Sequence, residues 1–379
     1  MSHASRPLFP AQDLPPWRRA VLKVGSSLLA ANGEGLSPRH ALNLAQFVSA
    51  SLAQGREVVL VSSGAVAAGR GIVHRTASAS LALAERQALA ALGQSPLIAL
   101  WQRFFEQPVA QVLLTHDDLR NRRRYLNARA TLQALLSLGA LPVINENDTV
   151  SVDELKLGDN DNLAAVVAAL IDADVLFIAT DIDGFHSANP RQYPDAQPIL
   201  DVEALTPEFF AMAGGAGSGV GTGGMRTKLE AAAKAAAAGV ETVLFNGTRA
   251  ETVGALAQGR LHGTRFRAAQ NRLAARKYWL RNVPVDAGVI VIDEGAAGAV
   301  RERGASLLPG GVTAAEGDFR RGDMITVRVA DGPSIARGVT QYPASDVRRL
   351  LRRHSRDIEG ILGYSYGENI IHRDDLIVI

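Results

Sequence analysis

The sequence predicts an α/β fold in which a mostly parallel central sheet is sandwiched by helices, followed by a small, mainly β C-terminal domain. Short apolar runs alternate with amphipathic helical segments from Ala20 to about Asn246, as expected for parallel strands joined by helices. After about Arg276 the segments become short and β-like, and glycine-containing turns separate several of them. Parallel sheets bind ligands beyond the carboxyl ends of their strands, so a functional site is expected in the loops that follow the strands.

Composition narrows the class of protein. A chain of 379 residues is too long for one ordinary domain and suits two. The 40 Lys plus Arg against 38 Asp plus Glu give a formal net charge of +2, so no general attraction to nucleic acid or membranes is expected. The sequence has no cysteine, which excludes disulfides, thiolate metal sites and cysteine nucleophiles. No apolar run is long enough for a membrane span, and a cytoplasmic protein is expected.

The chain divides by pattern into four parts. Residues 1–17 are rich in proline and polar residues and are predicted to form a disordered leader. Residues 18–270 carry the alternating pattern of the α/β domain. A linker is expected at 271–284, and the small β domain at 285–379.

The first domain is predicted to contain six strands: Ala20–Val24, Glu57–Ser62, Val109–Thr115, Pro142–Asn145, Val175–Thr180 and Thr242–Phe245. Several are continuous and rich in Val, Leu and Ile, which is typical of strands buried on both faces. One helix between them is expected to have Ser37 as N-cap and Pro38 in its first turn, and to end at Gly55. Two others, Arg120–Leu138 and Lys228–Ala238, are each followed by a glycine.

The second domain is predicted to contain four strands: Val289–Ile292, Met324–Val329, Ser334–Val339 and Ile370–Ile379. One helix is expected near Ser345–His354.

Two loops after predicted strands have the composition of anion-binding sites. Lys23 ends the first strand, and Gly25 allows an anion to approach the backbone closely while amide N–H groups and the ammonium group supply positive charge. An ordinary strand–loop junction with a solvated lysine is the alternative. The small residues of Ser62–Gly69 let a helix N-terminus press against a negative group, although tight strand–helix packing selects the same residues.

The third candidate loop consists of two segments, Asn145–Asp148 and Gly158–Asn162. Both segments are rich in carboxamide and carboxylate side chains and are flanked by apolar residues. This predicts recognition of a polar ligand, a metal or both, although a surface loop could be as polar. Asp159 and Asp161 cannot both be buried near Asp148 without cations, because like charges ~4 Å apart repel by roughly 4 kcal/mol at an effective dielectric of ~20. The spacing excludes an EF-hand.

The fourth loop, Gly214–Lys228, has seven glycines among fifteen residues. A glycine-rich turn that leads into a helix with a lysine in its first turn is a phosphate cradle in general form, although it is not a Walker A motif. Its Gly-x-Gly-x-x-Gly pattern does not favour a dinucleotide site, because Glu241 precedes the next strand instead of ending it. A flexible linker is the alternative. The fifth loop, Thr180–Gly184, is either a plain turn or a holder of a nucleotide's sugar or base.

Two separate anion cradles, two lysines and a polar acidic loop together indicate phosphoryl transfer without a covalent intermediate. Such catalysis depends on positioning and electrostatic stabilisation. If the acceptor is itself a carboxylate, two anions must meet, and Lys23, Lys228 and a Mg²⁺ ion would supply the positive charge. No serine–histidine–carboxylate set is evident, and the 8 histidines form no cluster in the sequence.

These loops together resemble the amino acid kinase family, and the resemblance runs from about Ala20 to the C-terminus. The motifs that carry it are Lys23–Ser27, Ser62–Ala65, Asn145–Asp148, Gly158–Asn162, Thr180–Asp181 and Gly221–Lys228. Each motif alone is weak, but the combination is specific, and it is similar to the bacterial members that phosphorylate glutamate. The C-terminal segments Gly304–Gly310, Gly317–Asp323, Ile361–Tyr364 and His372–Asp375 look like the PUA domain that many of these kinases carry.

The resemblance implies direct in-line phosphoryl transfer from ATP to the side-chain carboxylate of L-glutamate, giving L-glutamyl 5-phosphate for proline biosynthesis. It implies that Lys23 contacts the phosphates, that Lys228 stabilises charge on the transferring group, and that Asp161 holds both lysines in place. The implied glutamate-binding residues are Ser63, Asp148, Asn160 and the nearby Asn145. The implied ATP-binding residues are Lys23, Thr180, Asp181, Thr222, Gly223, Gly224, Met225, Arg226, Thr227 and Lys228.

The resemblance also implies Mg²⁺ as the cation that accompanies ATP, with no ligand assigned to it. It implies feedback inhibition by proline near the glutamate site, with Thr149–Leu157 as the expected place for the inhibitor's effect. A homo-oligomer, dimer or tetramer, is expected, and glutamyl phosphate reductase is a candidate partner.

Two rival interpretations are open. One is a kinase of the same fold that acts on N-acetylglutamate, aspartate, carbamate or UMP; the paired polar loops and the C-terminal domain argue against it. The other is an RNA-binding or RNA-modifying protein, because PUA domains often bind RNA. The predicted helix carries a basic face made of Arg348, Arg349, Arg352, Arg353 and Arg356. A solvated face is favoured, because the domain holds nearly as many acidic as basic residues.

Overall fold

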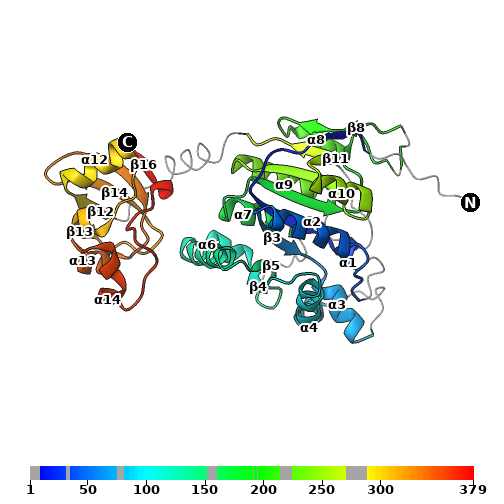
Figure 1. Cartoon of the computed structure of the whole chain (residues 1–379), viewed down its shortest axis with the longest axis horizontal. Coiled ribbons are helices and arrows are strands. Elements are labelled where there is room, and N and C mark those ends of the chain that lie inside the picture. Colours follow the sequence, from blue (N-terminus) through cyan, green and yellow to red (C-terminus); the bar gives the residue numbers. More distant parts are fainter. Residues whose placement is uncertain are drawn as a thin grey trace, which may run out of the picture. The chain divides into compact units, whose positions relative to one another are not determined.

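The computed structural model describes residues 9–30, 35–74, 81–151, 160–190, 192–193, 195–213, 224–269 and 288–379. The chain forms two compact units (Figure 1). The first contains Met1–Arg120 and Asn127–Asn271, and the second contains Asn121–Leu126 and Arg272–Ile379. Among the described residues, no helix is long and apolar enough to cross a membrane.

The first unit is built on a sheet with the strand order β1-β11-β10-β6-β2-β3-β5-β4, and β9 pairs with β11. Its strands are β1 Ala11–Asp13, β2 Arg19–Val24, β3 Glu57–Ser62, β4 Val109–Leu114, β5 Leu141–Glu146, β6 Val175–Thr180, β9 Asp201–Val202, β10 Glu241–Asn246 and β11 Arg260–Phe266. All neighbours from β10 to β4 run parallel, which confirms the predicted sheet and its six predicted strands. The antiparallel strand β11 was not predicted. A separate pair consists of β7 (Phe185–His186) and β8 (Pro198–Ile199).

The helices up to residue 257 are α1 Ser26–Leu29, α2 Ala41–Ala53, α3 Ala65–Ile72, α4 Leu83–Gln102, α5 His116–Arg120, α6 Arg122–Ser137, α7 Asn160–Leu170, α8 Pro207–Met212, α9 Met225–Ala237 and α10 Ala250–Ala257. The start predicted for α2 was wrong. Its N-cap is His40, because the Ser37 hydroxyl instead accepts a hydrogen bond from the backbone N–H of Arg39 at 3.3 Å in the preceding turn. The predicted glycine stop at Gly55 is confirmed, with φ of +73°.

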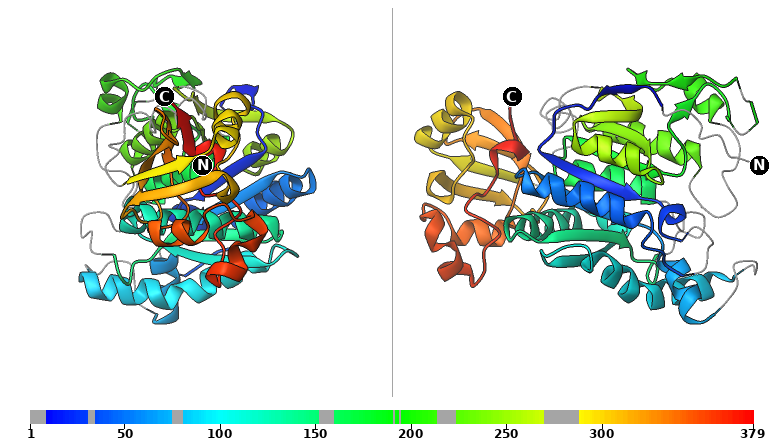
Figure 2. Two further views of the ribbon diagram at one scale, coloured as in Figure 1. Left: turned by 90° about the vertical axis from the view of Figure 1, so that its left-hand side faces the viewer. Right: turned by 45° about the vertical axis from the view of Figure 1, so that its right-hand side comes forward.

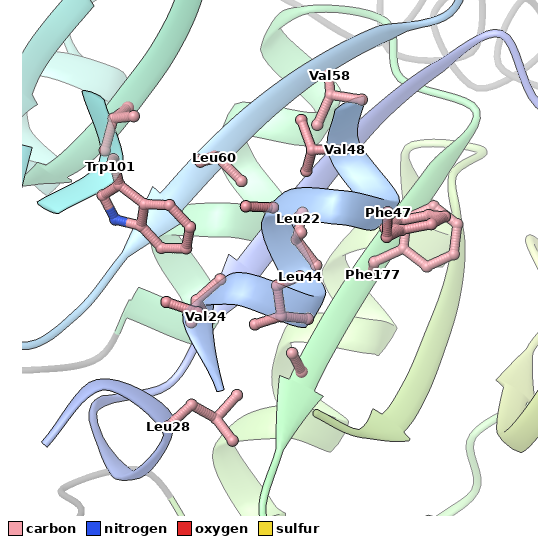
Figure 3. Close-up of a cluster of buried hydrophobic side chains, with 14 of the residues drawn as sticks. Leu22, Val24, Leu28, Leu44, Phe47, Val48, Val58, Leu60, Trp101 and Phe177 are labelled. Carbon is pink, nitrogen blue, oxygen red and sulfur yellow. The ribbon is translucent and has the colours of Figure 1, made fainter. Parts of the chain in front are cut away.

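Helices cover both faces of this sheet (Figures 1 and 2). On one face α2, α4 and α10 pack against alternate strand residues such as Leu22, Leu60 and Phe177, which are fully buried (Figure 3). The residues between them, such as Val21 and Val59, are fully buried on the other face, where α7 packs against β2. Each large apolar side chain buried in this way contributes about 1.5–3 kcal/mol. The core therefore fixes the strand ends from which the polar loops leave.

Helices α3 and α4 cross at two glycines. A Cβ atom added to Gly93 would lie 1.8 Å from the carbonyl oxygen of Ala65, and one added to Gly69 would lie 2.0 Å from that of Leu89. Neither position has room for a side chain. Part of the small-residue pattern after β3 thus comes from helix packing, which was the alternative to anion binding.

The predicted disordered leader is wrong for residues 9–17. Strand β1 lies within it and pairs antiparallel with β11, and the side chain of Gln12 donates hydrogen bonds to the carbonyl oxygens of Leu200 and Gly263 at 2.9 and 2.8 Å. Trp17 is buried in the main core, and the guanidinium of Arg56 lies 4.5 Å from its ring centroid. Residues 1–8 lie outside the described part of the chain.

The second unit contains a sheet with the order β13-β12-β14-β15-β16 over its own apolar core. Its elements are β12 Gly288–Ile292, α12 Glu294–Arg303, β13 Val312–Gly317, β14 Met324–Val329, β15 Ser334–Val339, α13 Ala344–Arg349, α14 Ile358–Leu362 and β16 Leu376–Val378. Three predicted strands are confirmed. The fourth is shorter than predicted, because Ile371 forms only an isolated bridge with Leu307. Strand β13 and helix α12 were not predicted.

The predicted basic helix face is wrong in part, because α13 ends at Arg349 and the other three arginines, Arg352, Arg353 and Arg356, lie beyond it. The two arginines on the helix are tied to the backbone of their own unit. Arg348 donates hydrogen bonds from its guanidinium to the carbonyl oxygens of Ala315, at 3.1 Å, and Gly317. Arg349 donates to the carbonyl oxygen of Ile361. These contacts favour a structural role for two of the five arginines.

Candidate functional site

The carboxyl ends of four parallel strands place the predicted site residues at one edge of the first unit's sheet. Strand β2 pairs with β3 on one side and with β6 on the other. The chain therefore continues from β2 to β3, β4 and β5 on one side before it returns to β6 and β10 on the other. A change of direction of this kind is where ligands bind in open α/β sheets. Lys23, near the end of β2, lies at this point.

At the centre of the site, two buried lysines share one carboxylate. The ammonium group of Lys23 lies 2.7 Å from Oδ1 of Asp161, and that of Lys228 lies 3.2 Å from Oδ2. Asp161 is 1% exposed and is the second residue of α7, while Lys228 lies in the first turn of α9. Two positive charges thus surround one negative charge in a buried position, which favours a further anion.

The carboxylate of Asp161 stays ionised in spite of its burial. Burial alone would raise its pKa, but the ammonium groups of Lys23 and Lys228 outweigh this effect and hold the pKa below the usual range. Hydrogen bonds from Lys23 and from the hydroxyl of Thr227, which lies 2.7 Å from Oδ2, act in the same direction. The structure therefore brings together the two lysines and the aspartate that the sequence singled out.

A network of amides lies next to this charged group. Nδ2 of Asn160 donates hydrogen bonds to the hydroxyl of Ser63 at 2.9 Å and to Oδ1 of Asn145 at 3.0 Å. Asn160 is 4% exposed, yet its Oδ1 has no hydrogen-bond partner among the described residues. A buried acceptor without a donor costs free energy, so a ligand or water with an N–H or O–H group is expected there. Three of the four predicted glutamate-binding residues are thus in contact.

The fourth, Asp148, follows β5 and is half-buried. Burial raises the pKa of its carboxyl to about 6, and the charge of Arg86 opposes this rise. Among the described residues, no hydrogen bond joins Asp148 to Ser63, Asn145 or Asn160. A carboxylate in this position could receive the ammonium group of an amino acid.

Two further residues lie near the amide network: Gln94, which the sequence analysis missed, and Glu146, which lies inside the predicted Asn145–Asp148 motif but was assigned no role. Gln94, on α4, accepts hydrogen bonds at Oε1 from Nε2 of Gln111 at 3.3 Å and from Nδ2 of Asn145 at 3.5 Å. Glu146 is buried and accepts a hydrogen bond from the hydroxyl of Ser151 at 3.0 Å. Gln94 lies inside a helix and in none of the polar loops, so no local pattern could have indicated it.

On the other side of Lys23 lie the ends of β6 and β10. Thr180 is buried, and its hydroxyl contacts Oδ1 of Asp181 at 3.3 Å. Beside them, Asp183 accepts a hydrogen bond from Asn246 at 2.8 Å and forms an ion pair with Arg249 at 2.9 Å. The predicted fifth loop is therefore held in place by Asn246 at the end of β10 and by Arg249 just beyond it.

The glycine-rich loop is only partly described. Gly224 is the N-cap of α9, and Met225 is the first helical residue. Arg226 forms an exposed ion pair with Glu230 at 3.2 Å, so its side chain is directed to solvent. Thr222 and Gly223 lie outside the described residues, as do Gly158, Asp159 and residues 152–157 of the predicted inhibitor loop.

The parallel sheet and its site have the features of an enzyme that transfers a phosphoryl group, because buried cations, amide groups and a glycine-capped helix start meet at the switch point. The sequence pattern of the amino acid kinase family matches residues 18–246, and that of the PUA domain matches residues 288–362. This chain belongs to the amino acid kinase family.

Relatives with similar sequences match this chain over nearly its whole length. A protein named glutamate 5-kinase from Xanthomonas oryzae pv. oryzae is 72% identical over 362 residues, which are 95% of this chain and 100% of the relative. A protein of the same name from Xanthomonas campestris pv. campestris is 73% identical over 362 residues, with the same two coverages of 95% and 100%. Another from Xylella fastidiosa is 68% identical over 375 residues, which are 98% of each chain.

Proposed function

We propose that this chain catalyses the ATP-dependent phosphorylation of the side-chain carboxylate of L-glutamate, giving L-glutamyl 5-phosphate in the cytoplasm as the first step of proline biosynthesis. The observation that carries the proposal is the pair of buried lysines on Asp161, which adjoins an amide network with an unsatisfied acceptor. The glutamate 5-kinase name of relatives that are 72% identical supports this choice of acceptor.

In the proposed reaction, a glutamate carboxylate oxygen attacks the γ-phosphorus of ATP in line with the departing ADP. Ser63, Asn145, Asn160 and Asp148 bind glutamate. Thr180, Asp181 and the segment 222–228 bind ATP. Lys23 and Lys228 lie on either side of Asp161 and reduce the repulsion between the two anions as negative charge shifts toward ADP. Catalysis then rests on positioning and electrostatics, as is general for phosphoryl transfer.

Mg²⁺ is proposed to enter with ATP. Within the described ranges, no group of three or more His, Asp or Glu side chains is placed to hold a metal ion. Mg²⁺ usually binds through one or two carboxylates together with substrate phosphates and water. Such an ion does not need a group of three protein carboxylates, so we propose that the phosphates of ATP carry it into the site. Bound there, the ion would neutralise part of the phosphate charge.

The choice of acceptor can be tested directly. The purified protein is given ATP, Mg²⁺ and hydroxylamine with L-glutamate, N-acetylglutamate, aspartate or carbamate in turn, and acyl phosphate is trapped as the hydroxamate. UMP is tested by ADP release. We expect hydroxamate with L-glutamate at a kcat/KM far above that of any other acceptor. Preference for another acceptor would overturn the proposal while leaving the family unchanged.

Feedback inhibition by proline is proposed to act through Thr149–Leu157, which lies between the two polar motifs of the glutamate site. Thr149 and Val150 are exposed, and Ser151 is buried against Glu146. Alanine substitutions along this loop should weaken proline inhibition with kcat retained. Unchanged inhibition across the whole scan would contradict the proposal.

The enzyme is also proposed to be a homo-oligomer, a dimer or tetramer, and to work with glutamyl phosphate reductase, because the acyl phosphate product is prone to hydrolysis. Light scattering of the purified protein would give its oligomeric state. A monomer at micromolar concentration would exclude a stable assembly.

A further inference from the structure

The hydroxyl of Thr227 is directed at Asp161. Thr227 is the third residue of α9 and lies in the glycine-rich segment expected to bind ATP. Its Oγ1 lies 2.7 Å from Oδ2 of Asp161 and 2.9 Å from the carbonyl oxygen of Gly224. The Asp161 oxygen that it contacts is the same one that lies 3.2 Å from the ammonium group of Lys228.

These distances favour the contact with Asp161 over the local one. A threonine in the first turn of a helix often donates to the carbonyl group three residues earlier, and Gly224 is in that position. A hydroxyl has one proton to donate, however, and the shorter contact is to an ionised acceptor. Hydrogen bonds to ionised acceptors are roughly twice as strong as neutral ones. The hydroxyl of Thr227 therefore donates its hydrogen bond to the carboxylate of Asp161.

The geometry points to Thr227 as a positioning residue: within the segment 222–228 proposed to bind ATP, its hydroxyl fixes Asp161 between the two lysines and is not directed at the nucleotide. This inference rests on the proposed phosphoryl transfer to glutamate. Asp161 lies in the first turn of α7 and Thr227 in the first turn of α9, so their contact joins the two helices at the ends that carry the charged groups. The ammonium group of Lys23 contacts Oδ1 of Asp161, and the Thr227 hydroxyl and the ammonium group of Lys228 contact Oδ2. Both carboxylate oxygens are therefore held in place.

If Thr227 is a positioning residue, removing its hydroxyl should change kcat much more than KM. Without the hydroxyl, the carboxylate keeps its two lysine contacts but loses the third contact that fixes its rotation about the Cβ–Cγ bond, so the two ammonium groups are positioned less exactly. Those groups matter most when charge shifts in the transition state, so the loss should appear in kcat and leave the binding of ATP nearly unchanged. A residue that binds ATP in the ground state would show the opposite pattern.

The test compares Thr227→Val, which keeps the shape without the hydroxyl, with Thr227→Ser, which keeps the hydroxyl. For the full-length enzyme, we expect Val to lower kcat roughly tenfold, or about 1.4 kcal/mol of activation free energy, with KM for glutamate and ATP within about twofold. Serine should restore kcat to within about threefold of wild type. The Kd of a non-hydrolysable ATP analogue with Mg²⁺, measured by calorimetry, should stay within about twofold in both variants.

Thr242→Val is the matched control, because Thr242 is buried on β10 in the same unit and its hydroxyl has no partner among the described residues. It should keep wild-type kcat and thermal stability. A Thr227→Val enzyme with weaker binding of the analogue and unchanged kcat would overturn the inference and return Thr227 to the nucleotide site. Equal losses in the Val and Ser variants would also overturn it. Failure of the wild-type enzyme to phosphorylate glutamate would instead count against the proposed function.

Discussion

Asp161 is the residue on which the charged part of the site depends. Its carboxylate is almost fully buried and compensates two ammonium groups that would otherwise repel each other inside the protein. Removing one partner from a buried ion pair typically costs about 3–5 kcal/mol, because the remaining charge is left uncompensated. The site thus depends on Lys23, Asp161 and Lys228 together. A substitution of any one of them should therefore disturb the other two charged groups as well.

Lys228→Met should lower kcat by roughly 10²–10³-fold and change KM for glutamate much less, because its charge acts mainly on the transition state. Steady-state kinetics with both substrates would measure this. Lys234→Met is the control on the same helix; that lysine is exposed and contacts Asn162, so kcat should stay within about threefold. Equal changes in kcat and glutamate KM in the Lys228 variant would contradict the assigned role.

Asp148 should make glutamate binding depend on pH. Its pKa is raised to about 6, so its carboxylate is ionised above that pH and protonated below it. If the ionised form receives the substrate's ammonium group, KM for glutamate should rise as the pH falls through about 6, while KM for ATP should stay flat. Asp148→Asn should have a high glutamate KM with no step in this range; a step that persists in this variant would assign the titration to another group.

The raised pKa of Asp148 also affects the stability of the folded state. Stability should fall as the pH rises, whereas glutamate binding should improve. Burial disfavours the charged form, so the folded state keeps its proton at pH values where the unfolded chain, with a pKa of 3.8, has lost it. The contribution of Asp148 to stability is therefore largest below pH 3.8 and falls as the pH rises toward 6. Asp148→Asn should remove this part of the pH dependence in chemical denaturation.

At the residue scale, sequence reasoning found the charged residues but not all of their partners. Lys23 lies near the end of β2, and Asp161 and Lys228 lie in the first turns of α7 and α9. The rule that ligands bind beyond the carboxyl ends of parallel strands predicted that their loops form one site. Gln94 lies inside α4 and contacts Asn145 only because of how α4 packs on the sheet. A contact of this kind depends on tertiary structure, so one sequence cannot reveal it.

At the scale of elements, the parallel core was predictable because its strands are continuous apolar runs between capped helices. Strand β11 was missed because Arg260–Phe266 mixes charged and apolar residues, and Gly263 is required where a Cβ atom would lie 2.2 Å from the carbonyl oxygen of Leu244. Helix α12 contains internal glycines that weaken the helical pattern, although Asp293 as N-cap and Gly304 at the end were visible signals.

The N-terminal segment should contribute measurably to stability, in spite of its loop-like composition. Trp17→Ala should lower the free energy of unfolding by about 3–5 kcal/mol, because it leaves a cavity in the main core. Urea denaturation would measure the change. Asp13→Ala in the same segment is the control: its ion pair with Arg260 is exposed, so it should change stability by less than about 1 kcal/mol. A harmless Trp17 substitution would show that the segment is not part of the fold's core.

At the scale of the whole molecule, two separate cores predict two folding units. The core around Leu22 and Phe177 belongs to the first unit, and the core around Ile290 and Ile325 belongs to the second. A chain ending near Arg276 should fold and keep glutamate kinase activity within about tenfold of the full chain. A folded fragment, verified by circular dichroism, that lacks all activity would mean that the second unit shapes the active site.

The crossing of α3 and α4 has a consequence for the protein's tolerance of mutation. Ser63 lies next to Gly64, the N-cap of α3, so any force that separates the two helices also displaces a hydroxyl that is proposed to bind glutamate. In a saturation library selected for growth without proline, Gly69 and Gly93 should permit no replacement, not even alanine, since one methyl group would meet a backbone oxygen. Two glycines to which no catalytic or binding role is assigned would then be among the least tolerant positions of the chain.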